Sequence, residues 1–438
     1  MRRRVAASFL LGLRAPLRSR LVAALLLLVA AAVVVLPAQL RTDGTDAGTL
    51  RMLLTWTLGP VVALLGAASL WAGCAAVSTE IEDKRFVGAA TTPARPFEIW
   101  LGRWLGLVAL DALLLAAALG GAYLQARARV PAPARAVRAL LPLDPAGVEE
   151  QVRRIYRDAM PEGAPDGREE DVLEAIRRDL AGEAYLPVGP GQGRDWRVRL
   201  PRRGGADGLR IDFSFLSAYG AAEGAKGSLR ALRDDGREIA ALRLTGDEAG
   251  AVSIAVPDGA LDGARTLTVA FRNEEDPESG AAVLVRHFGS MRATVPHGGL
   301  AANLARAGVA LLAALSLLAA LGTACGCCFS FPVAAFVATA VCAMVLVSGG
   351  ADYGEEAHSH AAAPGAVERA AGRFSERASR ALRAATGAID RAEALDRLGD
   401  GISVDAPAAW AALLADGVAL PLLLGALGAL ALRRRELP

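Results

Sequence analysis

The sequence predicts a polytopic α-helical membrane protein with six spans and an inserted α+β extracytoplasmic domain that contains a β-sandwich. Three observations predict this class. Six apolar blocks are long enough, or nearly so, to cross a bilayer. A polar region of domain size separates the third block from the fourth, and its second half alternates apolar with polar residues as strands do. Hydrophobic residues make up 53% of the 438-residue chain, and they are concentrated in the blocks.

The six blocks match the length that a membrane requires. A hydrocarbon core about 30 Å thick is crossed by about 20 helical residues. The blocks cover residues 20–39, 53–77, 100–123, 302–324, 329–348 and 408–432. The first block has the alternative of a cleaved signal peptide, since arginines precede it. Because that basic region is long and no clear small-residue cleavage site follows, we expect an uncleaved span.

Basic residues at both ends of the chain predict its orientation. Arginines precede the first block, and residues 433–435 are three arginines directly after the last one. Both termini are therefore expected in the cytoplasm, which requires an even number of spans. Four arginines lie on the predicted outside, against this rule: Arg127, Arg129, Arg135 and Arg138. Long domains translocate largely regardless of their charge, so the predicted orientation follows the basic residues at the two termini.

The predicted organisation has five parts. Residues 1–124 form the cytoplasmic N-terminus and spans one to three, and 125–300 form the extracytoplasmic domain. Residues 301–348 form spans four and five, joined by a tight turn at the CGCC run. Residues 349–407 form a second extracytoplasmic segment with an amphipathic helix, and 408–438 form the last span and a basic cytoplasmic tail.

The extracytoplasmic domain begins with helical signals and continues with strand signals. Helices are predicted over 144–160, after the Asp144-Pro145 start, and over 168–182, where acids come early and arginines late. Six alternating segments follow: WRVRL, LRIDFSF, EIAALRL, AVSIAV, RTLTVAF and AVLVRHF. Turn clusters separate them, a pattern typical of a small antiparallel β-sandwich.

Several function classes are not expected from this sequence. A net charge of +2 gives no indication of nucleic-acid binding. The chain has no G-x-x-x-x-G-K-[ST] loop to hold phosphates and no G-x-S-x-G nucleophile turn. We therefore expect no enzyme activity in this chain, and a membrane-bound ectoenzyme is the weakest alternative. The polar domain contains no cysteine, so no disulfide framework is expected there.

Two segments have residues that could bind a metal, but neither matches a defined site. The run DYGEEAHSH at 352–360 contains His358 and His360 among acidic residues. Three cysteines lie close together before the fifth block: Cys325, Cys327 and Cys328, with Cys342 within that block. We interpret the first segment as polar residues beside a span and the cysteines as small residues in a tight turn, and we predict no metal.

Two carboxylates lie inside predicted spans. Asp111 is central in the third block, and Asp416 lies about a third of the way into the sixth. Ionisable groups within a membrane are costly and are often functional. Both a proton or substrate role and a hydrogen bond between helices by a neutral carboxyl remain open for these residues.

The stretch TEIEDKRFVGAATTPARPFEIWLGRWLG at 79–106 follows the second block, and we predict a charged hook over 78–99 rather than a short neutral turn. Helical spacing places Glu80 near Lys84 and Glu82 near Arg85. The helix is expected to end in the GAATTP run, and Pro96 restarts the chain with Glu98 in the first turn of the next helix.

This hook resembles the cytoplasmic segment of the permease subunits of type-2 ABC exporters. Those segments have an acidic, charged helix, a Thr/Ser-x-Pro turn and a new span that opens near Gly-Lys or Gly-Arg. The corresponding residues here are Glu80, Glu82, Asp83, Lys84, Arg85, Thr91, Thr92, Pro93, Gly102 and Arg103. The C-terminal RRREL also resembles the family's ending. Gly88, Ala89 and Ala90 depart from the family's Leu-rich stretch, and only some members have a large extracytoplasmic domain.

The resemblance implies a bacterial cytoplasmic (inner) membrane protein that docks onto a separate cytoplasmic ABC ATPase. ATP and Mg would bind to that partner, so no cofactor is expected in this chain. Two permeases, as a homodimer or as a pair with a second permease, would assemble with two ATPases. Eight residues would couple the subunits: Glu80, Glu82, Asp83, Lys84, Arg85, Thr92, Pro93 and Arg95. The alternative is a non-transporting anchor or signalling subunit that relays ATPase motion to the outer domain.

Overall fold

A computed structural model gives the structure of this chain. It describes residues 9–10, 20–35, 44–82, 96–143, 185–201, 207–217, 225–246, 250–276, 282–286, 290–350 and 393–434, together with nine residues between 152 and 176. The chain divides into two compact units, one formed by Met1–Ala136 with Gly298–Pro438 and one by Val137–His297. The inserted domain thus begins later than the predicted residue 125, because the preceding helix continues to Arg129.

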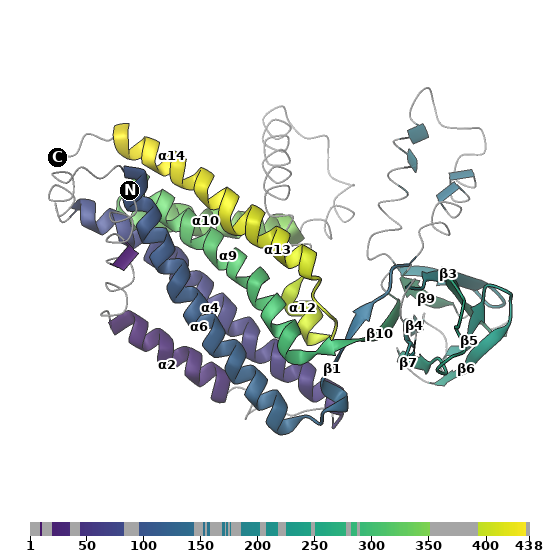
Figure 1. Cartoon of the computed structure of the whole chain (residues 1–438). Coiled ribbons are helices and arrows are strands. Elements are labelled where there is room, and N and C mark those ends of the chain that lie inside the picture. Colours follow the sequence, from purple (N-terminus) through teal and green to yellow (C-terminus); the bar gives the residue numbers. More distant parts are fainter. Residues whose placement is uncertain are drawn as a thin grey trace. The chain divides into compact units, whose positions relative to one another are not determined.

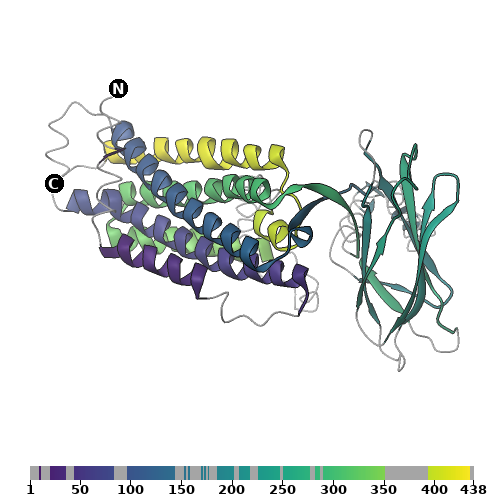
Figure 2. The ribbon, with the colours of Figure 1, turned by 60° about the horizontal axis from the view of Figure 1, so that its bottom comes forward.

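The first unit is a bundle of helices that run side by side (Figures 1 and 2). Its elements are α2 (Arg20–Val34), α4 (Asp46–Glu82), α6 (Pro96–Arg129), α9 (Leu300–Cys328), α10 (Phe331–Gly350), α12 (Ala394–Gly399) and α13 (Ala406–Leu414), which continues through the π-helical segment η5 (Ala415–Ala419) into α14 (Leu420–Arg434). The chain therefore crosses the bundle repeatedly, as a polytopic membrane protein does.

Four of these helical segments are long and apolar enough to cross a membrane. They are Asp46–Thr79, Pro96–Arg129, Leu300–Cys328 and Ala406–Arg433. The other two predicted spans correspond to shorter elements: α2 has 15 residues, and the apolar part of α10 that qualifies is Phe331–Met344. At 1.5 Å per residue the 37 residues of α4 extend about 55 Å, well beyond the thickness of a hydrocarbon core.

Helix α9 lies within the bundle and packs closely against α4 through glycines. A Cβ on Gly326 would lie 2.5 Å from the carbonyl oxygen of Cys74, and one on Gly322 would collide with the carbonyl oxygen of Leu70. From the other side, a Cβ on Gly73 would lie 2.8 Å from the carbonyl oxygen of Ala319. Such small-residue spacing lets two backbones touch, which is how helices associate where burial from water supplies no driving force.

The CGCC run is the last turn of α9 rather than the predicted tight turn to the next helix. The helix ends at Cys328, where the Phe329 amide still donates to the Cys325 carbonyl oxygen at 3.0 Å. Neither glycine nor cysteine stops a helix that is packed along its length, whereas Pro332, the second residue of α10, cannot continue one. The turn between the helices is therefore Phe329–Ser330.

The second unit consists of two antiparallel sheets. Its strands are β1 (Ala136–Leu140), β2 (Tyr185–Val188), β3 (Gly193–Arg199), β4 (Arg210–Ser217), β5 (Ala225–Arg233), β6 (Glu238–Gly246), β7 (Gly250–Ala255), β8 (Thr266–Asn273), β9 (Val283–Arg286) and β10 (Met291–Gly299). The larger sheet has the order β1-β10-β4-β9-β2, with β7 also paired to β4, and the smaller has the order β3-β8-β5-β6.

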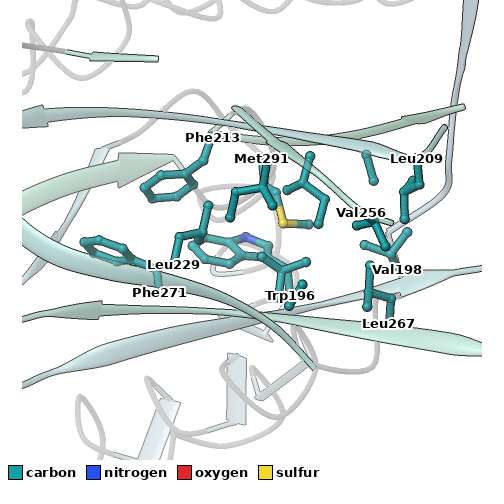
Figure 3. Close-up of a cluster of buried hydrophobic side chains, with 14 of the residues drawn as sticks. Trp196, Val198, Leu209, Phe213, Leu229, Val256, Leu267, Phe271 and Met291 are labelled. Atoms are coloured by element: carbon teal, nitrogen blue, oxygen red, sulfur yellow. The ribbon is translucent and has the colours of Figure 1, made fainter. Parts of the chain in front are cut away.

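Alternate residues of both sheets form one hydrophobic core (Figure 3). In β8 the buried residues are Leu267, Val269, Phe271 and Asn273, each two positions from the next. The Phe213 ring of β4 packs against two rings of the other sheet, with its centroid 5.6 Å from that of Trp196 on β3 and 5.0 Å from that of Phe271 on β8. The period of two in the sequence thus puts one face of each sheet into a shared core.

The six strands predicted from alternation are confirmed as β3, β4, β6, β7, β8 and β9. Four strands were not predicted: β1, β2, β5 and β10. The alternation fails in β10, where both Ala293 and Thr294 are buried and Pro296 is present, and in β5, where Ser228 is buried on the face opposite Leu229. Of the two predicted helices of this domain, the described residues 152–153, 156–157, 169–170, 172–173 and 176 are helical.

The packing of α9 on α4 leads to a prediction. Gly322→Ala places a methyl group against the α4 backbone and should lower the thermal unfolding temperature of the detergent-solubilised protein by several degrees, corresponding to about 1–3 kcal/mol. Gly120→Ala in α6 is the matched control, because a Cβ there meets nothing within 4 Å. Since alanine is the better helix former, the control should be neutral or slightly stabilising. Equal losses in both variants would contradict this account of the packing.

Candidate functional site

The structure describes only the two ends of the predicted hook. Glu80 and Glu82 lie in the last turn of α4, which ends at Glu82, and α6 begins at Pro96 as predicted. Six predicted coupling residues lie outside the described residues: Asp83, Lys84, Arg85, Thr92, Pro93 and Arg95. The charged helix–turn itself therefore stays a prediction, and the described geometry concerns the helices that lead into it and out of it.

Three aromatic rings stack along the start of α6. The Phe97 and Trp100 ring centroids are 5.8 Å apart, and those of Trp100 and Trp104 are 5.5 Å apart with an interplanar angle of 11°. Both tryptophans are buried, and they belong to one core cluster. Its other buried members come from α4, α6, α9 and α14: Val77, Leu107, Ala319, Ala320, Cys327 and Leu432. The cluster thus joins both helices of the hook to the rest of the bundle, and we call it the aromatic cluster.

The two tryptophans contact their neighbours in different ways. The Trp100 ring lies directly over Gly425 of α14, where any side chain would collide with it. The indole N–H of Trp104 donates to the backbone carbonyl oxygen of Ser316 in α9 at 3.1 Å. In the described part of the chain, the Trp100 indole nitrogen is buried and has no hydrogen-bond partner. Trp100 is therefore held by close packing against Gly425, whereas Trp104 is held by a hydrogen bond to the backbone of α9.

Glu98 and Arg103 lie among the three aromatic residues in sequence and are buried as well. Glu98 is 6% exposed and lies in the first turn of α6, as the sequence predicted for a carboxylate at the positive end of a helix. Arg103 is 9% exposed, one turn further along. Buried charges are rarely tolerated without partners, so this end of α6 is a polar site within the bundle.

Asp111 lies in the middle of α6 and contacts α4. Its Oδ1 accepts a hydrogen bond of 2.7 Å from the Ser69 hydroxyl, in a buried environment. Within the described residues its second oxygen, Oδ2, is buried and has no hydrogen-bond partner. The helix–helix hydrogen bond that the sequence left open as one interpretation is therefore present, and one carboxyl oxygen is left over for another partner.

Asp416 lies at a local change of helix geometry. The residues Ala415–Ala419 form a π-helical turn between α13 and α14, and Asp416 is 1% exposed. The Ser316 hydroxyl of α9 donates to the Gly417 carbonyl oxygen at 2.7 Å. Insertions of this kind change the i→i−4 hydrogen-bond ladder and are frequent at functional sites. Ser316 thus connects α6, through Trp104, with the π-helical turn.

At the other end of the bundle, a polar clamp holds the chain that precedes α13. The Asn303 side chain of α9 donates to the Ile402 carbonyl oxygen at 2.9 Å and accepts from the Val404 amide at 2.7 Å. Arg51 of α4 pairs with Asp400 at 3.4 Å. This clamp is not among the features predicted from the sequence, although the Asn at the start of a span could have indicated it.

The predicted amphipathic helix and the DYGEEAHSH run lie outside the described residues. Among the cysteines, Cys74, Cys325 and Cys342 pack in one apolar cluster with Leu70, Ala334 and Ala338. No group of three or more potential metal ligands occurs in the part of the chain that the structure describes. Cys74, Cys325 and Cys342 pack as small apolar residues between α4, α9 and α10.

Comparison with known proteins leaves the family undecided. No protein-family model matches the sequence, and a search of curated proteins gives no match. The function is therefore inferred from the residues of the bundle and the contacts between them.

The contact between α4 and α6 leads to a prediction. Ser69→Ala and Asp111→Ala should each lower the free energy of unfolding in detergent. A double-mutant cycle should give a coupling of about 0.6 kcal/mol, the average for hydrogen bonds between membrane helices, and at most about 1.7 kcal/mol. The control pair is Ser78→Ala with Asp111→Ala, because the Ser78 hydroxyl bonds within its own helix to Cys74. The control effects should add. A Ser69–Asp111 coupling near zero would exclude a stabilising hydrogen bond.

Proposed function

We propose that this chain is the membrane-spanning permease subunit of an ATP-driven exporter of the ABC type, with six spans and an outer β-sandwich. Its hook would dock onto a separate cytoplasmic ATPase, which would bind ATP and Mg. The protein would lie in the bacterial inner membrane with both termini in the cytoplasm, as a homodimer or paired with a second permease. No enzymatic step would be performed by this chain.

One observation carries the proposal: both helices that enclose the hook are fixed in the same buried aromatic cluster. Val77 at the end of α4 and Trp100 and Trp104 at the start of α6 share this cluster with residues of α9 and α14. A force applied to a flexible loop would be lost in loop motion. The helix ends that lead into the hook are packed in one cluster, so a force on the hook would move α4 and α6 as one body. Well-packed interiors transmit displacement in this way.

The aromatic cluster also suggests the path from the hook to the centre of the bundle. Trp104 is bonded to Ser316, and Ser316 is bonded to the π-helical turn that contains Asp416. Ser69 and Asp111 join α4 to α6 further along α6 than Trp104. Movement of the hook would act first on these intramembrane polar groups. Asp111, with one oxygen free of hydrogen bonds within the described residues, would be the group available to a polar substrate or a proton.

A relay of motion to the outer domain is the second candidate, and a specific observation favours it. The chain passes from β10, which ends at Gly299, to α9 at Leu300 with no residue between them. From the end of α6 at Arg129 to the start of β1 at Ala136 there are only residues 130–135, which include a short 3₁₀ turn. Short connections to two helices of the bundle are what a mechanical relay would need.

The docking of an ATPase is tested by charge reversal in the hook. Glu80→Lys/Glu82→Lys should reduce co-purification of the cognate ATPase by at least about tenfold, because two attractive contacts become repulsive. Glu169→Lys/Glu170→Lys makes the same charge change at two exposed residues of the inserted domain and should leave co-purification unchanged. Unaltered co-purification and coupled ATPase activity in the Glu80/Glu82 variant would contradict the proposal.

Export and relay are separated by a flexible insertion. Four Gly/Ser residues between Gly299 and Leu300 should leave ATPase binding intact in both cases, because the hook is unchanged. If the chain exports a substrate through its spans, substrate-stimulated ATPase activity in proteoliposomes should survive the insertion. If it relays motion, the response of the outer domain to ATP, measured as a change in protease sensitivity, should be lost.

A further inference from the structure

The outward face of the smaller sheet is rich in arginine. Leu229 and Ala231 of β5 point into the core, so Ser228 and Arg230 belong to the opposite face. The strand register places Arg243 of β6 and Arg272 of β8 on that face too. Arginine is common in this chain, which has 48 basic residues, so the number of arginines alone indicates nothing.

What distinguishes this face is the residue at its centre. Ser228 is directly opposite Arg243 on one side and Arg272 on the other. Its residue exposure is only 4%, and within the described residues its hydroxyl oxygen is buried without a hydrogen-bond partner. A buried hydroxyl without a partner loses its bonds to water and gains none in return. Such a group at the centre of a cationic face needs an explanation that the described residues do not supply.

The geometry points to a binding site for a phosphate group, formed by Arg230, Arg243 and Arg272 around Ser228. Two strand spacings separate the Cα atoms of Arg243 and Arg272 by about 10 Å, and Ser228 lies midway between them. Arg230 is two residues along β5 on the same face, so the strand register places three arginines around one serine. We call this set the arginine site.

Phosphate fits the arginine site better than a carboxylate does. A carboxylate has two oxygens and is satisfied by one guanidinium fork, whereas a phosphate has three or four oxygens that can accept from several forks and a hydroxyl at once. Carboxylates lie on or beside this face as well. Asp195 of β3 and Arg230 of β5 are opposite the same residue of β8, Ala270, on its two sides. Glu238 forms an ion pair with Arg230 at 3.9 Å. Both members of that pair are about half exposed, and exposed ion pairs are weak, so a phosphate can compete for Arg230.

The test measures binding of inorganic phosphate to the purified full chain in an uncharged detergent by titration calorimetry at constant ionic strength. Arg243→Gln/Arg272→Gln should weaken binding at least about tenfold, because two charge-assisted contacts are lost. Arg197→Gln/Arg199→Gln removes the same charge from β3 of the same sheet and should weaken binding less than about threefold through reduced long-range attraction. Equal losses in the two variants would overturn the site, as would absence of phosphate binding to the unaltered protein.

Ser228→Ala separates a ligand-binding role from a structural one. It should weaken phosphate binding about tenfold, because a hydroxyl bond to an anion is lost, and should leave the thermal unfolding temperature of the ligand-free protein equal or higher. A fall in the unfolding temperature with unchanged phosphate binding would assign Ser228 to the fold and overturn its role in the site.

Two further ligands define the chemistry. Acetate at the same concentration should bind at least about tenfold more weakly than phosphate, and equal binding would overturn the preference for phosphate. Glycerophosphoglycerol, a soluble phosphodiester headgroup, distinguishes the source. Tighter binding than inorganic phosphate would assign the site to a lipid headgroup or phosphodiester polymer, and weaker binding would assign it to a free phosphate or monoester; either result supports the site.

Discussion

The contact between the backbones of α4 and α9 is the constraint on which the bundle depends. Gly73, Gly322 and Gly326 bring the two helices so close that carbonyl oxygens of one lie where side chains of the other would be. α9 also contacts α6, α10 and α14, so its distance from α4 sets the space left for every other helix. In a membrane, where lipid tails are as apolar as leucine, close van der Waals contact is the main source of such stability.

Close packing explains where polar groups can lie inside the bundle. Ser69 meets Asp111, Trp104 meets Ser316, and Ser316 meets Gly417 because each pair belongs to helices that approach closely enough for a hydrogen bond of about normal length. These contacts run from the hook toward the π-helical turn. The same packing that stabilises the bundle therefore supplies the connections that the proposed coupling requires.

The inserted domain follows a different principle. Its stability comes from one face of each sheet, where Trp196, Phe213 and Phe271 form a core that the chain can bury without a membrane. The outward faces of the two sheets do not contribute to this core. The proposed arginine site lies on one of them, and the Ser228 hydroxyl, which is buried without a partner among the described residues, marks it as different from an ordinary solvated surface.

Much of this architecture was determined by the sequence alone. Block length determined the four long membrane helices, the period of two determined six of the strands, and Pro96 marked the start of α6. These features are local, because hydrophobic period and helix-start signals depend on residues near one another in the chain. The charged hook was visible in the same way, from Glu80 to Arg95, as a break between apolar blocks.

Only the tertiary structure decided which residues meet. Ser69 and Asp111 are 42 residues apart, Trp104 and Ser316 are 212 apart, and no local pattern relates them. The same holds for Ser228 between two arginines, since strand order and register decide which side chains are opposite. Even the CGCC run became the end of a helix because the packing of α9 outweighs the weak helix preference of its glycine. Partners across a fold are set by how helices and strands pack, and a single sequence contains that information only indirectly.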